Sequence, residues 1–124
     1  MSIRAGDSRG VALLRIYTLA GDRVGQQSLA EALVRTARAA GLAGATVLCA
    51  QAGYGRHGFN STLTVFVYRP ERQPLVVEIA DTLERLEAFL GQVRALNRRQ
   101  RLVTLERIAV HAYGAAGKSG TTPP

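Results

Sequence analysis

The order of apolar patterns along the chain is the feature that most restricts how it can fold. Strand-like and helix-like stretches alternate within 124 residues. The stretches are strand-like over residues 13–19, 45–52, 74–80 and 102–113, and they have helical spacing over residues 29–40 and 83–97. The predicted order is therefore strand, helix, strand, strand, helix, strand. This order closes most simply as an antiparallel sheet with two helices on one face, the ferredoxin-like βαββαβ arrangement of the α+β class.

A helix-start signal precedes each helical stretch. Ser28, three residues before Glu31, forms a capping box in which both side chains accept hydrogen bonds from backbone amides. Asp81, three residues before Glu84, predicts the start of the second helix in the same way. Gly41 can end the first helix, because glycine readily adopts the left-handed backbone conformation of a helix C-terminus.

The folded domain is predicted to span residues 12–113. Residues 1–11 and 114–124 are rich in small and polar residues and are expected to be flexible tails. No apolar run approaches the ~20 residues of a membrane helix, and the N-terminal residues lack the apolar region of a secretory signal. The single Cys49 excludes an intrachain disulfide and a cysteine-cluster zinc site, and its apolar neighbours predict an inert core position. We therefore expect a cytoplasmic protein.

The net charge of +7 raises the question of nucleic-acid binding. Fifteen of the sixteen basic residues are arginine, and they are scattered along the chain apart from the cluster of Arg94, Arg98, Arg99 and Arg101. No tail of like charges and no RNA-binding aromatic motif accompanies them. A solvated, arginine-rich surface is therefore favoured, and nucleic acid is not an expected partner.

Two nucleotide-binding motifs occur without the context that they need. Residues 53–58 spell GxGxxG, but the β-prone residues 59–67 follow them, where a dinucleotide fold needs a helix. Residues 117–119, Gly-Lys-Ser, resemble the end of a Walker A loop but lack its first glycine and its following helix. His57 and His111 do not have the spacing of metal ligands, and no nucleophile–base pair is recognisable. We expect neither enzymatic activity nor a metal site.

The connection between the second and third strands is longer than a hairpin requires. About twenty residues separate Tyr54 from Gln73, whereas hairpin loops usually have about two to five residues. The middle of this connection, residues 62–68, is itself strand-like, and long connections on a compact scaffold often carry function. Residues 55–73 are therefore expected to form a partner-facing loop. Within the third strand, Glu78 is expected on the face or edge of the sheet, paired with an arginine.

The residues around the start of this connection match a known pattern. Residues 41–47, Gly-Leu-Ala-Gly-Ala-Thr-Val, are followed by a Gly53-Tyr54-Gly55-Arg56 corner. This region resembles the PII signalling family, in which the same corner precedes the partner-contacting T-loop. Residues 74–81 and 102–106 are closer still to the uncharacterised PII-like subgroup, and the likeness covers nearly the whole domain. It implies a homotrimer with ligand clefts between subunits, where PII proteins bind ATP or ADP and so control transporters and enzymes. A sheet with one uncovered face also favours the homotrimer.

By position, the resemblance implies a ligand site built from two parts of the chain. These are Gly53, Tyr54, Gly55, Arg56 and His57 at the corner, and Arg98, Arg99 and Arg101 after the second helix. Arg56 would reach phosphate, because a guanidinium can pair with two oxygens at once. The Gly-Asp-Gly-Lys phosphate loop of PII is absent, and Asn97-Arg98-Arg99-Gln100-Arg101 stands in its place. The alternative is that the glycines only turn the chain and that the arginine cluster is solvated.

Two functions follow from these expectations. The leading one is a non-enzymatic homotrimeric regulator that requires no cofactor and senses a small anionic ligand, such as the adenine nucleotides ADP, ATP or AMP. It would signal through residues 55–73 to a partner, which the resemblance implies is a membrane transporter or channel. Whether these residues act as a mobile switch or as a rigid arm of the trimer is left open. The competing function is a metal-handling or enzymatic ferredoxin-like trimer, similar to the copper-tolerance proteins.

Overall fold

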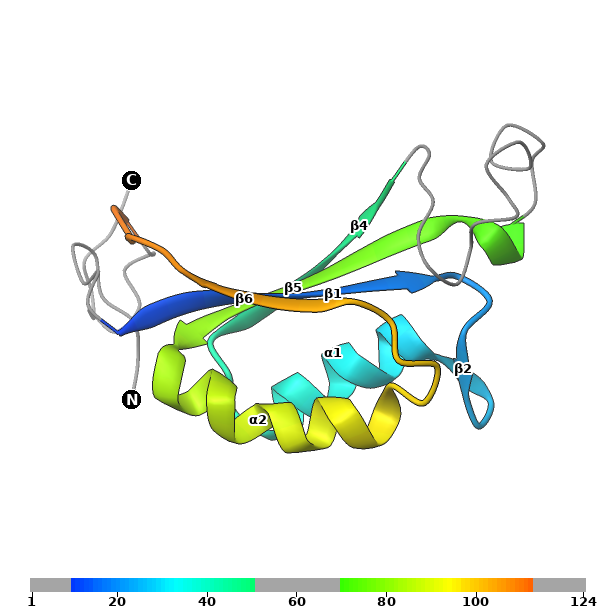
Figure 1. Cartoon of the computed structure of the whole chain (residues 1–124), viewed down its shortest axis with the longest axis horizontal. Helices are drawn as coiled ribbons and strands as arrows, with labels where there is room; N and C mark the ends of the chain where they lie inside the picture. Colours follow the sequence, from blue (N-terminus) through cyan, green and yellow to red (C-terminus); the bar gives the residue numbers. More distant parts are fainter. Residues whose placement is uncertain (1–9, 51–69, 113–124) are drawn as a thin grey trace, which may run out of the picture.

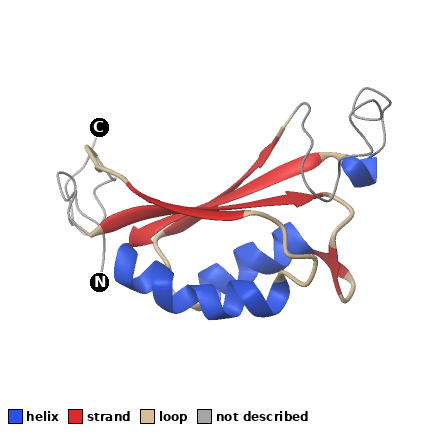
Figure 2. Cartoon of the chain, viewed as in Figure 1, coloured by secondary structure: helices blue, strands red, loops and turns tan. Residues whose placement is uncertain are grey.

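A four-stranded antiparallel sheet with two helices on one face forms the domain in the computed structural model, which describes residues 10–50 and 70–112 (Figures 1 and 2). The elements are β1 (Val11–Leu19), β2 (Arg23–Val24), β3 (Gln27–Ser28), α1 (Leu29–Ala39), β4 (Gly44–Cys49), η3 (Pro70–Arg72), β5 (Pro74–Thr82), α2 (Leu83–Leu96) and β6 (Val103–Arg107). The strand order of the large sheet is β4-β5-β1-β6. The predicted ferredoxin-like arrangement is confirmed, and the short β2–β3 hairpin is an addition that the sequence patterns did not indicate.

The core lies between the sheet and the helices. Alternate residues of the two central strands face the helices, and the apolar stripes of the helices face the sheet. The largest fully buried apolar side chains are Leu14, Ile16, Leu33, Val77, Ile79, Leu86, Val11 and Val93. Both helices are apolar on one side only. They therefore pack side by side as a single layer against one face of the sheet. None of the described helices is long and apolar enough to cross a membrane.

The start and end of α1 follow the sequence signals. Ser28 is the N-cap, and its Oγ accepts a hydrogen bond from the Glu31 amide at 3.0 Å. Gly41 has a φ of +78°, the left-handed conformation that lets the chain leave the helix. The Ser28 cap and Gly41 thus mark the two ends of α1, while the Glu31 carboxylate accepts from Arg35 at 2.9 Å. Strand β4 begins three residues after Gly41.

The start of α2 differs from the prediction by one residue. Thr82, and not Asp81, is the N-cap, and its hydroxyl accepts from the Arg85 amide at 3.2 Å. The reason is that β5 continues to Thr82, so that strand alternation turns Asp81 toward the helices, where it is fully buried. The Asp81 carboxylate accepts from the amides of Ala43 (2.8 Å) and Thr82 (2.6 Å), and from the Arg85 guanidinium at 3.3 Å. Asp81 therefore joins the end of β5 to the turn between α1 and β4.

Two expectations about the strands were wrong. The last strand ends at Arg107, and residues 108–112 do not continue it, because its partner β1 begins at Val11, immediately after a turn at Gly10 with a φ of +75°. Cys49 is exposed and not in the core. It is the final residue of β4, an edge strand along which five of the six residues are exposed, so its apolar neighbours did not indicate burial.

Candidate functional site

The loop between α2 and β6, which we call the arginine loop (Asn97 to Arg101), is held in one conformation by Asn97. The Asn97 amide group donates to the Arg101 carbonyl and accepts from the Arg101 backbone amide, both at 2.9 Å. Within the loop, Gln100 has a φ of +55° and its amide donates to the Asn97 carbonyl at 3.0 Å. A non-glycine residue in this conformation is uncommon and is kept only where its surroundings require it. The first and last residues of the arginine loop are thus hydrogen-bonded to each other.

The end of the arginine loop is fixed to a distant turn by a buried ion pair. The Arg101 guanidinium donates from Nε to Asp22 Oδ2 at 2.8 Å and from Nη2 to Asp22 Oδ1 at 2.7 Å. The two side chains are 10% and 5% exposed. A further contact that fixes the Asp22 carboxylate comes from the Leu19 amide, which donates to Oδ2 at 2.9 Å. This two-point geometry is the strongest form of arginine–carboxylate pairing.

The three arginines that were predicted to hold a ligand are therefore not equivalent. Arg101 is committed to Asp22. Arg99 lies at the edge of the same carboxylate, with 3.9 Å between its Nε and Asp22 Oδ1, and its side chain is 71% exposed. Arg98 is exposed and has no side-chain partner within the described part of the chain. Arg98 and Arg99 are the two guanidiniums that the loop presents to solvent. The sequence signals did not identify Asp22, which follows Gly21 in an ordinary-looking turn.

Both anchors of residues 51–69 lie at the same end of the sheet as the arginine loop (Figure 1). The Ala50 amide donates to the Pro74 carbonyl at 2.9 Å, which closes the ends of this segment on each other. The Gly21 amide donates to the Glu71 carbonyl at 2.8 Å, and the Ala20 amide donates to the Gln73 carbonyl at 2.9 Å. The turn that contains Asp22 is therefore bonded to the residues that follow the segment.

The corner residues that complete the predicted ligand site, namely Gly53, Tyr54, Gly55, Arg56 and His57, lie outside the described residues. Their place in the site stays a prediction.

The sheet face opposite the helices, which we call the open face, carries a row of apolar side chains across β4, β5 and β1 and on to Leu102, just before β6. In the register, Leu48 of β4 lies opposite the half-buried Val76 of β5, and Val76 lies opposite Tyr17 of β1. The Tyr17 amide donates at 2.9 Å to the carbonyl of Leu102, the residue immediately before β6. Tyr17, Leu48 and Leu102 are three of the four large apolar residues that are exposed in the described part of the chain. Such a row of largely exposed apolar side chains is typical of a surface that another molecule covers.

A charged cluster lies beside this row on the open face. Arg15 Nε donates to Glu78 Oε2 at 3.0 Å, and Arg15 Nη1 donates to Glu106 Oε1. The hydrogen bond with Glu78, and then that with Glu106, raises the pKa of Arg15 above the ordinary value of a guanidinium. The expectation that Glu78 pairs with an arginine on the sheet is confirmed. The single Arg15 guanidinium thus bridges two carboxylates and links β5, β1 and β6.

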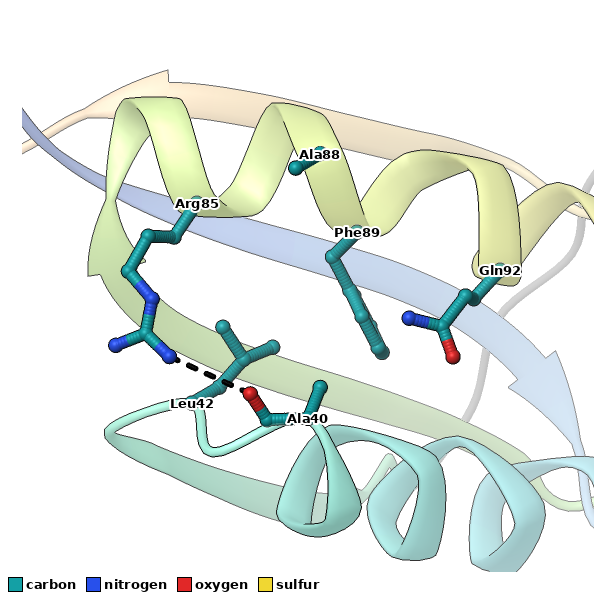
Figure 3. A pocket seen from close by; sticks show the side chains of 6 residues that line it. All are labelled: Ala40, Leu42, Arg85, Ala88, Phe89 and Gln92. Atoms are coloured by element: carbon teal, nitrogen blue, oxygen red, sulfur yellow. Dashed lines mark hydrogen bonds between the residues drawn. The ribbon is translucent and has the colours of Figure 1, made fainter.

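Two surface hollows lie on the helix side, and both are lined mainly by apolar side chains. The hollow between the C-terminal end of α1 and α2 has a volume of about 170 Å³ and is lined by Ala40, Leu42, Arg85, Ala88, Phe89 and Gln92 (Figure 3). The Arg85 guanidinium donates to the carbonyls of Ala40 (3.3 Å) and Gly41 (2.9 Å) and so caps α1. The second hollow, of about 310 Å³, lies between α1 and β4. In the described residues, no three His, Cys, Asp or Glu side chains come together as a metal site would require.

Comparison with known proteins gives three findings that agree with one another. The model of the family DUF190, described as "Uncharacterized ACR", matches residues 11–110. The UPF0166 protein of Aquifex aeolicus (strain VF5) is 35% identical over 98 residues, which are 79% of this chain and 90% of that protein. A crystal structure from Thermus thermophilus, described as a PII-like signaling protein, superposes with a TM-score of 0.55 at 20% identity, over 81% of this chain and 88% of that chain. The family match covers both the arginine loop and the turn at Asp22. The chain therefore has the same fold as that PII-like structure, and it belongs to the DUF190 family.

Proposed function

We propose that this protein is a non-enzymatic homotrimeric regulator that binds a small anionic ligand, an adenine nucleotide in the first instance, next to Arg98 and Arg99. The observation that carries the proposal is a convergence at one end of the sheet. Two exposed guanidiniums lie on a loop that is internally fixed, and that loop is joined through Asp22 to the anchor of residues 51–69. Paired guanidiniums on a fixed loop suit a phosphate group, because the planar donors match its oxygens.

The homotrimer is supported by the open face. Its apolar row crosses β4, β5 and β1 and reaches Leu102, and packing against other copies would remove that row from water. The neighbouring Arg15 guanidinium is already paired with both Glu78 and Glu106, which lowers the cost of placing it beside such an interface. Ligand clefts between subunits, as the PII resemblance implies, would then bring Arg56 of one copy toward the arginine loop of another.

Signalling would pass through residues 55–73 to a partner, for which a membrane transporter or channel is the first candidate. The Ala50–Pro74 hydrogen bond closes β4 and β5 on each other, so we expect their pairing not to depend on residues 58–67. Deletion of residues 58–67 should leave a trimer that still binds the ligand but no longer captures a partner from a membrane extract. If the deletion produces monomers instead, the segment is an arm of the trimer and the signalling role is wrong.

The ligand is tested by thermal unfolding of the purified protein with ADP, ATP, AMP and, separately, divalent metal ions. A ligand present at 100 times its Kd stabilises the folded state by about 2.7 kcal/mol. We expect a rise in Tm with at least one nucleotide, and loss of that rise in the Arg98→Ala/Arg99→Ala variant. The matched control is Arg35→Ala/Arg38→Ala, which removes the same charge from the exposed side of α1. A rise in Tm with metal ions alone would contradict the proposal and favour the metal-handling function.

A further inference from the structure

Asp22 is a buried carboxylate in a basic region, and both of its carboxylate oxygens accept hydrogen bonds. Of the described carboxylates, it and Asp81 are the two that are buried. Its Oδ2 accepts from Leu19 and from Arg101, and its Oδ1 accepts from Arg101 and lies 3.9 Å from Arg99. A carboxylate is costly to bury unless it is paired. The pairing with Arg101 therefore couples two parts of the chain that are 79 residues apart.

On one side, Asp22 fixes the arginine loop. The loop has two ends, and Asn97 holds the first at the C-terminus of α2, where its amide donates to the Val93 carbonyl at 2.8 Å. The second end, Arg101, is held by Asp22 at two points. Because Arg98 and Arg99 lie between these ends, the positions of their guanidiniums depend on both attachments.

On the other side, Asp22 fixes the residues that precede β5. The Asp22 amide donates to the Leu19 carbonyl at 3.0 Å, while the Leu19 amide donates to the Asp22 carboxylate, so the turn is closed by two hydrogen bonds. Within this turn, Gly21 approaches Glu71 so closely that a Cβ atom on Gly21 would lie 2.8 Å from the Glu71 Cβ and carbonyl oxygen. The turn and η3 are thus in direct backbone contact.

We propose that Asp22 is a positioning residue for the anion site: it holds the arginine loop in its binding conformation and ties that loop to the anchor of residues 51–69. This inference rests on the proposed function at Arg98 and Arg99. Asp22 does not itself contact the ligand. It acts through its hydrogen bonds with Arg101 and through the contact of its neighbour Gly21 with Glu71.

If Asp22 acts through its charge, removal of the carboxylate should change the affinity for an anion in one direction. If Asp22 acts by positioning the loop, the affinity should change in the opposite direction. The carboxylate is a negative charge beside a site for anions, so its removal makes the site more positive by one charge. If Asp22 acts only through its charge, Asp22→Asn should bind an anion more tightly. If Asp22 positions the loop, the same variant should bind the anion more weakly. The Arg101 guanidinium then loses its charged partner, and Arg98 and Arg99 lose their fixed arrangement.

The experiment is calorimetric titration of ADP into the full chain and into Asp22→Asn. The matched control is Glu31→Gln, which removes the same charge from an exposed ion pair with Arg35. We expect ADP binding to weaken about ten-fold in Asp22→Asn, which corresponds to about 1.4 kcal/mol, and to change less than two-fold in the control. Equal or tighter binding by a folded Asp22→Asn overturns the proposal.

A second measurement, made without nucleotide, separates this proposal from the proposed function. Hydrogen exchange should become about ten-fold faster at the amides of Ala20 and Gly21 in Asp22→Asn, because the turn that bonds them to Gln73 and Glu71 loosens. Unchanged exchange contradicts the positioning role even where ADP binding falls. If the unmodified chain fails to bind ADP, the ADP site is wrong, and the exchange result alone decides the structural role of Asp22.

Arg101→Lys tests the same proposal without changing the net charge of the protein. It also serves where Asp22→Asn does not fold. Lysine keeps the charge opposite Asp22 but loses the two-point geometry of the guanidinium. We expect weaker ADP binding together with faster exchange at Ala20 and Gly21. Binding and exchange that both match the unmodified chain contradict the proposal.

Discussion

Gly21 lies against Glu71 with no room for a side chain between them, since a Cβ atom at Gly21 would come within 2.8 Å of the Glu71 backbone carbonyl. This contact joins the turn after β1 to η3, immediately before β5. Gly21→Ala should therefore push the two segments apart and lower the free energy of unfolding by about 1–3 kcal/mol. Denaturant unfolding of the purified protein measures this change.

The control for Gly21 is Gly91, in the middle of α2. A Cβ atom there would have no neighbour within 4 Å. Gly91→Ala should raise the free energy of unfolding by about 0.5–1 kcal/mol, because alanine is the better helix former. A pair of variants that move stability in the same direction would contradict the assigned contact between Gly21 and Glu71.

Asp81 and Thr82 should differ in how much stability each contributes. Thr82→Ala removes an N-cap hydroxyl and should cost about 1 kcal/mol. Asp81→Ala removes a fully buried carboxylate and leaves the amides of Ala43 and Thr82 without their acceptor, so it should cost about 3 kcal/mol. Urea unfolding curves compare the two. If Thr82→Ala is the more damaging variant, the stabilising role assigned to the buried Asp81 carboxylate is wrong.

The open face makes a prediction about assembly. Tyr17→Glu places a charge in the apolar row of β1, and burial of an unpaired charge in a subunit interface costs several kcal/mol. We expect the unmodified chain to have the mass of a trimer in light scattering at micromolar concentration and Tyr17→Glu to have the mass of a monomer. Arg38→Gln, on the exposed side of α1, makes the same change in net charge and should remain trimeric. A trimeric Tyr17→Glu would place the interface elsewhere.

The sequence predicted the elements of this fold better than the site. The capping box at Ser28 and the alternation in β5 are local patterns, and local patterns fix the type and order of the elements. The pairing of Asp22 with Arg101 depends on the order of strands in the sheet, which brings together residues 79 positions apart. Nothing in the local sequence distinguishes Arg101, which is buried against Asp22, from Arg99, which is exposed.

Errors at the ends of strands have a similar cause. Cys49 lies in an apolar stretch, but β4 is an edge strand and has a neighbour on one side only. The apolar pattern is the same for an edge strand and for a central strand, so burial of Cys49 could not be separated from exposure. The last strand was predicted to be too long because its length is set by where β1 begins, and not by its own residues.

The central claim, an anion site on the arginine loop, is tested most directly by calorimetric titration of ADP into the Arg98→Ala/Arg99→Ala variant. Each hydrogen bond to a charged group contributes about 1.5–3 kcal/mol, so loss of both guanidiniums should weaken binding about 100-fold or more. The charge-matched variant Arg35→Ala/Arg38→Ala should bind ADP within two-fold of the unmodified chain. Equal affinity of the Arg98→Ala/Arg99→Ala variant and the unmodified chain would contradict the site.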